Sequence, residues 1–299
     1  MDSPGTCARG RCVRSVVNSL TMTKKVVAII QGRMSSSRLP GKILADIAGQ
    51  PMLQRVFMRT SRSASVSQTL FATTTDPSDD PVAEYCDFSG IPFTRGNLYD
   101  VLDRYYRAAK QAKADYVVRI TADCPVIDPV LIDDVVNAVI SDESTVDFAA
   151  NRLPPPWNRT YPIGLDTEVC TFAALERAWK EAKEPQHREH VMPYFYEGVK
   201  LTTINRQLQT GTSPRGYNIA LLQHTTDFGD YRWTVDTPED LEFMRQVYSR
   251  FDGRDDFTWK EVLDVVHNEP DLMKSNSGVQ HKTLKDIDTR ALKKKESRK

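Results

Sequence analysis

Residues 26–42 have the sequence VVAIIQGRMSSSRLPGK. Residues 26–30 are all apolar and mostly β-branched, a pattern typical of a strand buried on both faces. The strand gives way to a loop of small hydroxylated residues that carries Arg33, Arg38 and Lys42. Open α/β sheets bind ligands at the carboxyl ends of their strands, and arginine and lysine both bind phosphate oxygens. We therefore expect this loop to bind a polyphosphate.

The loop differs from two common phosphate-binding motifs. It lacks the pattern G-x-x-x-x-G-K-[ST], because Gly32 and Gly41 are too far apart and Ile43 follows Lys42. It also lacks the dinucleotide-binding pattern G-x-G-x-x-G. The alternative is an exposed basic loop beside a core strand, but Pro40 and Gly41 stiffen and turn the chain where the lysine must fold back.

Composition excludes several classes of partner. The chain has 299 residues with 40 acidic and 40 basic side chains, so no net charge favours nucleic acid or a membrane surface. No apolar stretch approaches the length of a membrane span. The cysteines are odd in number and scattered, which predicts a reducing, cytoplasmic location; they are Cys7, Cys12, Cys86, Cys124 and Cys170.

The pattern along the chain predicts a single α/β domain over residues 24–270, with a disordered extension over 1–23 and a polar tail over 271–299. A smaller excursion is expected over 151–205, beginning with a long proline-rich connection. The apolar runs predict strands at 70–75, 92–94, 116–120, 165–169 and 231–236. Helical spacing predicts helices near 51–57, 82–88, 100–109, 172–182 and 187–196, and from residue 238.

Two aspartates follow predicted strands and are candidate metal ligands. Asp123 comes directly after a buried strand, and Cys124 and Pro125 then turn the chain away. Magnesium is usually held by one or two carboxylates together with substrate phosphates. Asp123 could instead cap the next helix, although Asp128 is better placed to do so. Asp236 has the same arrangement, and for it a helix cap is an equal alternative.

The cationic loop resembles the R-x-x-S-x-R-L-P-x-K loop of the cytidylyltransferases that make CMP-sugar acids, in the branch containing spore coat polysaccharide biosynthesis protein F. Two further anchors of that family occur in family order, at Asp123 and at residues 234–240 (TVDTPED). Residues 187–194 (HREHVMPY) resemble another of its segments. The resemblance covers residues 24–267 and implies a Rossmann-like, mostly parallel sheet of the nucleotide-diphospho-sugar transferase type.

The resemblance implies attack by a sugar hydroxyl on the α-phosphorus of CTP, with release of pyrophosphate. Arg33, Arg38 and Lys42 would stabilise the leaving pyrophosphate, and Asp123 and Asp236 would hold the Mg²⁺ cofactor. No dedicated general base is implied. Many relatives have serine where this chain has Asn97 or Leu98. The nucleotide-binding residues implied are Gly32, Ser37, Arg95, Asn97 and Asp100.

The acceptor-binding residues expected from the same resemblance are Arg119, Arg152, Glu168 and Arg188, with Arg159, His187 and His190 as further candidates. Arg119 lies in a strand built for burial, so it should pair either with Asp123 or Asp236 or with the substrate. Arg104 either contacts the nucleotide or pairs with Asp100 along a helix. A homodimer is expected, with the apolar residues Val191, Phe195 and Tyr196 against the second subunit.

Two other functions are compatible with parts of this sequence. A glycosyltransferase that uses a nucleotide sugar would share the fold, but such enzymes usually carry a D-x-D metal motif at a strand end. The only D-x-D here lies at residues 286–288, in the polar tail. A non-catalytic binding subunit would have no need of two metal-binding carboxylates beside the cationic loop.

Overall fold

A computed structural model describes residues 24–140 and 145–275. The predicted extension at 1–23, the D-x-D motif at 286–288 and most of the predicted tail lie outside the described residues. None of the helices in the described part is long and apolar enough to cross a bilayer.

The first predicted strand forms the centre of the fold. It is β1 (Val26–Gln31), and its neighbours β4 (Gln68–Thr74) and β6 (Tyr116–Thr121) both run parallel to it. Successive side chains of a strand point to opposite faces. In β1, Val26, Ala28 and Ile30 belong to one hydrophobic core, and Val27 and Ile29 belong to a second core. A strand that fills two cores needs apolar residues at every position.

The main sheet is mixed and has nine strands. Every strand except β8 and β10 runs in the direction of β1. The predicted class, an α/β fold with a mostly parallel, Rossmann-like sheet, is confirmed. In spatial order the strands are β5 (Phe93–Gly96), β4, β1, β6, β8 (Glu168–Thr171), β7 (Phe148–Ala150), β11 (Asn218–Leu222), β10 (Leu208–Thr212) and β9 (Thr202–Asn205).

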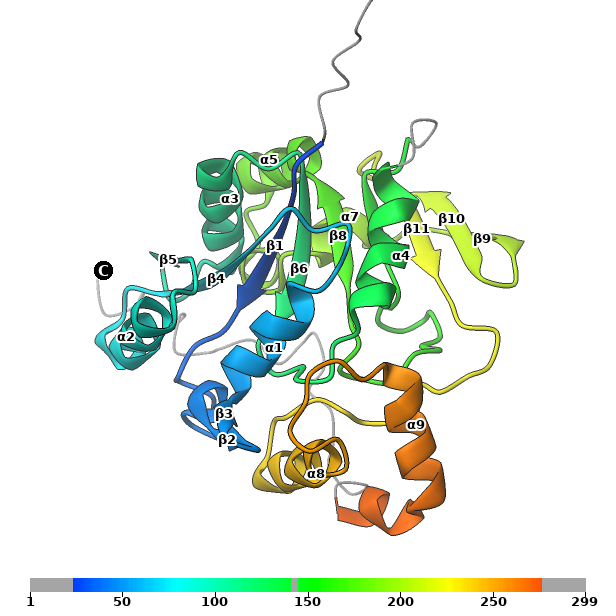
Figure 1. Cartoon of the computed structure of the whole chain (residues 1–299). Coiled ribbons are helices and arrows are strands. Elements are labelled where there is room, and N and C mark those ends of the chain that lie inside the picture. The colour runs from blue at the N-terminus through cyan, green and yellow to red at the C-terminus, as the bar shows by residue number, and fades with distance from the viewer. Residues whose placement is uncertain (1–23, 141–144, 276–299) are drawn as a thin grey trace, which may run out of the picture.

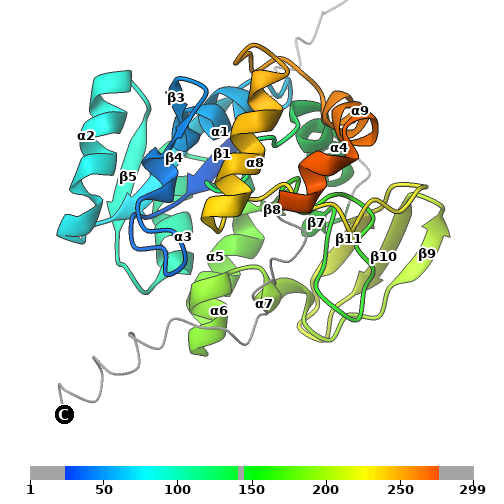
Figure 2. The same cartoon turned by 90° about the horizontal axis from the view of Figure 1, so that it is seen from below.

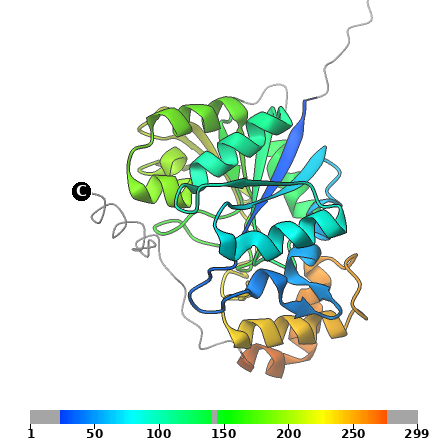
Figure 3. The same ribbon diagram turned by 90° about the vertical axis from the view of Figure 1, so that its left-hand side faces the viewer.

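Helices cover both faces of the sheet (Figures 1 and 3). The first core lies under α1 (Met52–Thr60), α2 (Asp80–Ser89), α4 (Pro129–Ile140), α8 (Pro238–Ser249) and α9 (Trp259–Asn268). The second core lies under α3 (Val101–Ala112), α5 (Phe172–Glu181) and α7 (Pro193–Tyr196), and α6 (Pro185–His190) packs against α3. A two-stranded sheet, β2 (Asp46–Ile47) with β3 (Gln50–Pro51), lies before α1.

Most predicted elements are present within a few residues of their expected ends, but the strand predicted at 231–236 is wrong. Arg232 forms a single isolated bridge with Ile163. Further along, the backbone N–H of Val235 donates to the carbonyl of Asp123 at 2.8 Å. The segment therefore lies across the end of β6 and does not join the sheet. Its alternating pattern reflects the complete burial of Trp233 and Val235.

The single helix predicted at 187–196 is also wrong. The segment forms the short helices α6 and α7, which are separated by Val191 in the left-handed region at φ 67°. Phe195 and Tyr196 were expected to face a second subunit, but they are buried against Phe148 in the chain's own core. Their apolar character is explained by this packing.

Residues 151–205, the predicted excursion, include both a long loop and part of the sheet. Their strand β8 lies between β6 and β7, antiparallel to both. Because β8 runs antiparallel, its first residue lies at the edge where β6 ends. The loops after β1, β4, β5, β6 and β7 meet at this same edge, which faces the viewer in Figure 2. The fold therefore gathers the candidate residues on one side of the sheet.

Candidate active site

The cationic loop after β1 is held by tight packing and backbone hydrogen bonds. A Cβ added at Gly32 would lie 2.7 Å from Cβ of Ala122 and 2.9 Å from Cζ of Phe71, so only glycine fits there. The N–H of Met34 donates to Asp79, a fully buried carboxylate, at 2.7 Å. Gly41 adopts φ 76°, and its N–H donates to the carbonyl of Met34. These contacts bend the loop back toward the sheet.

The bend carries Lys42 to the two predicted metal-binding carboxylates. Its Nζ donates to Oδ2 of Asp123 at 2.8 Å and to Oδ1 of Asp236 at 2.9 Å. It also donates to the carbonyl of Val235 at 2.8 Å, and the residue is only 8% exposed. Residues that are 81 and 194 positions from Lys42 in the chain thus share one ammonium group.

The electrostatics of this group follow from its geometry. Burial by itself would lower the pKa of Lys42, but the charges of Asp123 and Asp236 raise it above its ordinary value. For Asp236 the signs are reversed: burial alone would raise its pKa, but Lys42, Arg38 and Arg232 lower it to about 2. At neutral pH the group therefore holds ionised lysine and ionised Asp236.

Arg38 and Arg232 complete the surroundings of Asp236. Both guanidinium groups contact Oδ2 of Asp236, at 2.7 Å and 2.9 Å respectively. Arg232 also binds both carboxylate oxygens of the fully buried Asp240 at 2.9 Å. Asp240 in turn accepts from the N–H groups of Asp236 and Thr237, which closes a capping box at the start of α8. Thr237 and Asp240 cap α8, so the helix does not need Asp236 as its cap. The oxygens of Asp236 contact the cations of the site instead.

Asp123 and Asp236 are the described carboxylates placed to bind a cation here. Both accept a hydrogen bond from one ammonium group, so a single cation can contact both. Two carboxylates with substrate phosphates suit Mg²⁺. No cluster of three or more His, Cys, Asp or Glu side chains within the described residues is arranged to bind a metal. Asp128 caps α4 by accepting from the N–H groups of Val130 and Leu131, so the alternative in which Asp123 caps this helix is wrong.

The predicted nucleotide-binding residues in β5 and in the loop after it have local partners. Arg95 donates to the carbonyl of Thr74 at 2.7 Å and pairs with Asp80 of α2 at 2.6 Å. Asn97 accepts from the N–H of Tyr99. Asp100 caps α3 and forms a two-bond ion pair with Arg188, at 3.0 and 2.6 Å. The loop is thereby tied to α2 and α6. Ser37 lies exposed and Arg33 half-buried on the loop after β1.

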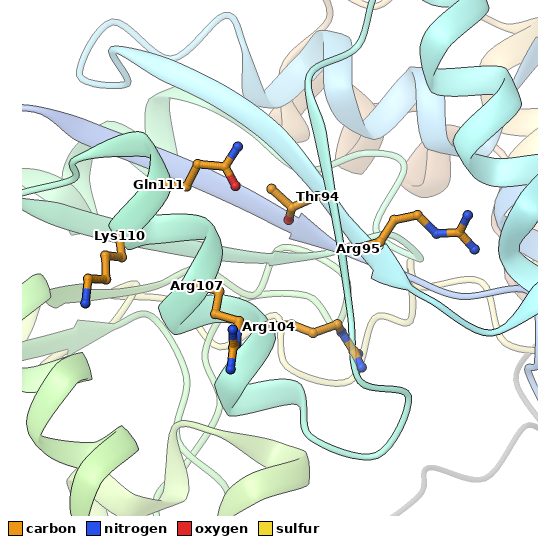
Figure 4. Close-up of a pocket in the computed structure, with 6 residues that line it drawn as sticks. All are labelled: Thr94, Arg95, Arg104, Arg107, Lys110 and Gln111. Atoms are coloured by element: carbon orange, nitrogen blue, oxygen red, sulfur yellow. The ribbon is translucent and has the colours of Figure 1, made fainter.

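Arg104 does not pair with Asp100 as proposed for the helix surface. Its Nη1 donates to the carbonyl oxygens of Asn97 and Leu98. It also lines a pocket of about 360 Å³ whose other lining residues are Thr94, Arg95, Arg107, Lys110 and Gln111. Figure 4 shows the Arg104 guanidinium within the bend of the loop that joins β5 to α3, whereas Lys110 and Gln111 lie further along α3.

The expected pairing of Arg119 with Asp123 or Asp236 is wrong. Its guanidinium pairs with Glu168, which lies opposite it where β6 and β8 are adjacent. The strand register places these two side chains next to each other, because β8 begins at the edge of the sheet where β6 ends. Burial by itself would lower the pKa of Arg119, but Glu168 raises it above its ordinary value.

A second ion pair lies in the long loop after β7. Arg159 binds both oxygens of Asp166, and although burial alone would raise the pKa of Asp166, Arg159 lowers it. Arg152 is close enough to contribute to that lowering. The Arg152 side chain forms no hydrogen bond or ion pair with another described residue, in contrast to Arg119 and Arg188. His187, a weaker candidate, is buried and bonds to Glu197.

Four residues around the candidate site were not predicted from the sequence: Asp79, Asp166, Arg232 and Asp240. Two signals were available. Asp79 lies in a turn directly after a strand, as Asp123 does. Arg232 lies between Tyr231 and Trp233 and precedes Asp236 by four residues and Asp240 by eight, a spacing that suits a shared ion-pair network.

Comparisons with known proteins show the family to which the chain belongs. The family model for cytidylyltransferases matches residues 27–261. Spore coat polysaccharide biosynthesis protein SpsF of Bacillus subtilis is 28% identical over 82% of this chain and 95% of its own length. The 3-deoxy-manno-octulosonate cytidylyltransferase of Solibacter usitatus is 33% identical over 76% of this chain and 96% of its own length.

A solved structure supports the same relationship. A cytidylyltransferase from Leptospira borgpetersenii is 29% identical and superposes with a TM-score of 0.74, covering 86% of this chain and all of that protein. The residues matched by the family model, 27–261, include the cationic loop, Asp123 and Asp236. This chain therefore belongs to the cytidylyltransferase family and is a CTP-dependent nucleotidyltransferase.

Proposed function

We propose that the enzyme transfers CMP from CTP to a hydroxyl group of a sugar acid, for the synthesis of a surface glycan. The observation that carries the proposal is the group formed by Lys42, Asp123 and Asp236 at the carboxyl edge of β1 and β6. Arg38 lies on the same carboxylate. The names of the relatives, a spore coat polysaccharide protein and 3-deoxy-manno-octulosonate cytidylyltransferases, support the choice of acceptor class.

The reaction forms one bond and breaks one. The acceptor oxygen bonds to the α-phosphorus of CTP, the bond from that phosphorus to the oxygen bridging to the β-phosphorus breaks, and pyrophosphate leaves. Such a transfer depends on positioning and on neutralising phosphate charge. Arg33, Arg38 and Lys42 would bind the phosphate oxygens and stabilise the charge that develops on pyrophosphate. The hydroxyl proton passes to solvent, and no side chain is assigned as its base.

Mg²⁺ is the cofactor in this proposal, with Asp123 and Asp236 as its protein ligands. When bound, the ion would withdraw electron density from the phosphoryl group and lower the pKa of an acceptor hydroxyl. In the structure, the Lys42 ammonium group bonds to both carboxylates. This group would turn to the phosphates once the cation replaces it at the carboxylates.

The acceptor carboxylate is assigned to Arg152. Among the four predicted acceptor residues, Arg119, Glu168 and Arg188 are held in ion pairs. Arg152 is half-buried beside Asp166, without an ion pair to any residue of the described chain. Arginine binds carboxylates with two parallel hydrogen bonds.

We also propose a cytoplasmic homodimer. The buried cysteines Cys86, Cys124 and Cys170 are free thiols, which suits a reducing compartment. All four residues of the outer strand β9 are exposed, and sheet edges of this kind are commonly covered. Light scattering coupled to gel filtration measures the mass and so tests the dimer.

Pyrophosphate release from each of the four nucleoside triphosphates, with Mg²⁺ and a panel of sugar acids, tests the reaction. We expect release with CTP and one acceptor, and its loss in Asp123→Asn. Arg152→Met should raise the KM for the acceptor at least tenfold and leave the KM for CTP unchanged, with the exposed Arg206→Met as its control. Consumption of a nucleotide sugar without use of CTP would instead support the glycosyltransferase.

A further inference from the structure

A pocket that the proposed reaction does not use lies at the same edge of the sheet as the candidate site. Its volume is about 320 Å³, within the usual range of about 300–1,000 Å³ for small-molecule sites. The loop after β7, the strand β10 and the loop after β11 form its walls. Figure 2 shows β10 and β11 at the end of the sheet away from β5. Residues that line the pocket include Trp157, Asn158, Thr160, Gln209, Gln223 and Asp227.

The pocket continues the line of the candidate site along the sheet. Because β11 runs parallel to β7, Gln223, directly after β11, lies at the edge where Asp123 follows β6. The spatial order is β6, β8, β7, β11, and three strand spacings of about 4.8 Å amount to about 14 Å. This distance exceeds the width of one sugar ring. A sugar acid with its hydroxyl beside Asp123 would therefore need a further unit to fill the pocket.

One loop connects the pocket with the residues expected to surround the acceptor. Asn158 lines the pocket, whereas its neighbour Arg159 binds both oxygens of Asp166. Trp157 lines the pocket and also packs edge to face against the buried Tyr196, with the ring centroids 6.1 Å apart. The loop after β7 thus reaches both the pocket and the ion pairs beside it.

The polar groups of the pocket are suited to an amide and to hydroxyl groups. Nε2 of Gln209 donates to Oε1 of Gln223 at 2.9 Å, which leaves Oε1 of Gln209 to accept and Nε2 of Gln223 to donate. A ligand amide has the complementary N–H and C=O and would extend this pair. Asp227 binds the N–H of Gly229 through one oxygen, and its other oxygen can accept from a hydroxyl group. No lysine or arginine lines the pocket, so it does not suit a carboxylate or a phosphate.

Trp157 supplies the apolar wall. Its ring is half-buried, and its indole N–H forms no hydrogen bond with another described residue. An aromatic ring with a polar N–H offers apolar contact area and a donor together. The C–H groups on one face of a sugar ring can pack against such a ring. Together with the glutamine pair, this wall favours an uncharged sugar with an acylamino group.

We propose that this pocket is a saccharide-binding subsite, which takes an uncharged sugar unit with an acylamino group. The N–H of that group donates to Oε1 of Gln209, its carbonyl accepts from Nε2 of Gln223, and the sugar ring packs on Trp157. Because the pocket adjoins the acceptor residues, the sugar unit belongs to the far end of the acceptor and is joined to the carboxylated ring. This last step rests on the reaction proposed above.

Nitrogen-15 NMR of the full chain tests the pocket without CTP or an acceptor. Trp157 is one of four tryptophans, so its indole N–H signal is the one missing from Trp157→Leu. The probes are methyl N-acetyl-β-glucosaminide and methyl β-glucoside, which has a hydroxyl in place of the acetamido group. We expect the first to shift this signal saturably and the second to bind at least about fivefold more weakly, the effect of two lost hydrogen bonds. No shift of the Trp157 signal, or equal affinities, would overturn the proposal.

Two matched variants test the glutamine pair. Gln209→Met keeps the length of the side chain and removes its amide, so the preference for the acetamido probe should disappear. Gln207→Met alters an exposed glutamine in the turn before β10 that does not line the pocket, so the preference should remain. Loss of the preference in both variants, or in neither, would contradict the role of Gln209.

Pyrophosphate release tests the link with the acceptor. Sugar acids of the panel are compared with the same acids carrying a glycosidic N-acetylglucosamine. We expect the extended acid to have a KM at least about fivefold lower with kcat unchanged, and Gln209→Met to remove the difference. Equal KM values would show that the pocket does not serve the acceptor. Absence of release with every acid would contradict the proposed reaction, and the NMR titration would still decide whether the pocket binds a sugar.

Discussion

Lys42 is the residue that joins the two halves of the candidate site. It bonds to Asp123 from the β6 end and to Asp236 from the segment before α8. Lys42→Met removes the ammonium group and leaves two neighbouring carboxylates without it. We expect kcat/KM for CTP to fall by about 10²-fold or more, the loss typical when one charge-stabilising donor is removed. Lys183→Met, at a lysine bonded only to a backbone carbonyl, is the control and should retain full activity in the pyrophosphate assay.

At the same scale, the low pKa of Asp236 predicts how stability depends on pH in metal-free protein. The folded-state pKa is about 2 against an ordinary 3.8, so the carboxylate stabilises the fold above pH 4 and loses this contribution as pH falls toward 2. The difference corresponds to about 2 kcal/mol. Urea titrations at pH 5 and pH 2.5 in EDTA should show a smaller loss for Asp236→Asn than for the unaltered chain. An identical loss in both proteins would contradict the assigned pKa.

At the scale of elements, the contact between the ends of β1 and β6 fixes the cationic loop. Gly32→Ala would place its Cβ 2.7 Å from that of Ala122. We expect the free energy of unfolding to fall by about 1–3 kcal/mol, the usual cost of overpacking, and activity to fall as the loop shifts. Ala122→Gly removes the clashing atom, so the double variant should recover part of the loss. Strictly additive effects in urea denaturation would show that this contact does not hold the loop.

The start of α8 holds Asp236, a proposed metal ligand, through a buried ion pair. Asp240 binds Arg232, which binds Asp236, and Asp240 also accepts from the N–H of Asp236. Asp240→Asn should lower the free energy of unfolding by about 3 kcal/mol, because it leaves the buried Arg232 charge poorly paired. The neighbouring exposed Glu239→Gln should change it by less than about 0.5 kcal/mol. Similar effects of both substitutions would contradict the role of the network.

The elements also show which sequence signals were informative. The apolar run at 26–30 predicts a doubly buried strand, and β1 is one. Residues 231–236 carry an equally convincing strand pattern, but they pack across the sheet edge, where burial and alternation occur without a ladder. Periodicity reports which side chains are buried and does not report what the backbone bonds to.

At the scale of the whole molecule, the site residues come from segments that are far apart in sequence. The direction of β8 explains why the ion pairs of the site were hard to predict from the sequence. If β8 ran parallel to β6, its first residue, Glu168, would lie at the edge of the sheet opposite the candidate site. Its antiparallel course puts it beside Arg119. Asp123 and Asp236 were predictable from their positions after apolar runs, whereas the Arg119–Glu168 and Arg188–Asp100 pairs depend on strand order and helix docking.

Because the site joins loops from both ends of the described domain, CTP should stabilise the whole fold. With Mg²⁺ and CTP at a hundred times its Kd, the free energy of unfolding should rise by about 2.7 kcal/mol. Thermal denaturation should then shift upward by several degrees for a domain of this size. ATP at the same concentration is the control. No shift with CTP, or an equal shift with ATP, would contradict a CTP site built from these loops.

In the proposed reaction, an acceptor hydroxyl attacks the α-phosphorus of CTP beside Lys42, Asp123 and Asp236. The most direct measurement follows both ends of the nucleotide, with CTP carrying ³²P at either the α or the γ position, Mg²⁺ and the panel of sugar acids. We expect the α label in a CMP-linked acceptor and the γ label in pyrophosphate, and we expect Lys42→Met and Asp123→Asn to lose both products. Recovery of the γ label in the acceptor, or release of the α label only as free CMP or CDP, would contradict this reaction.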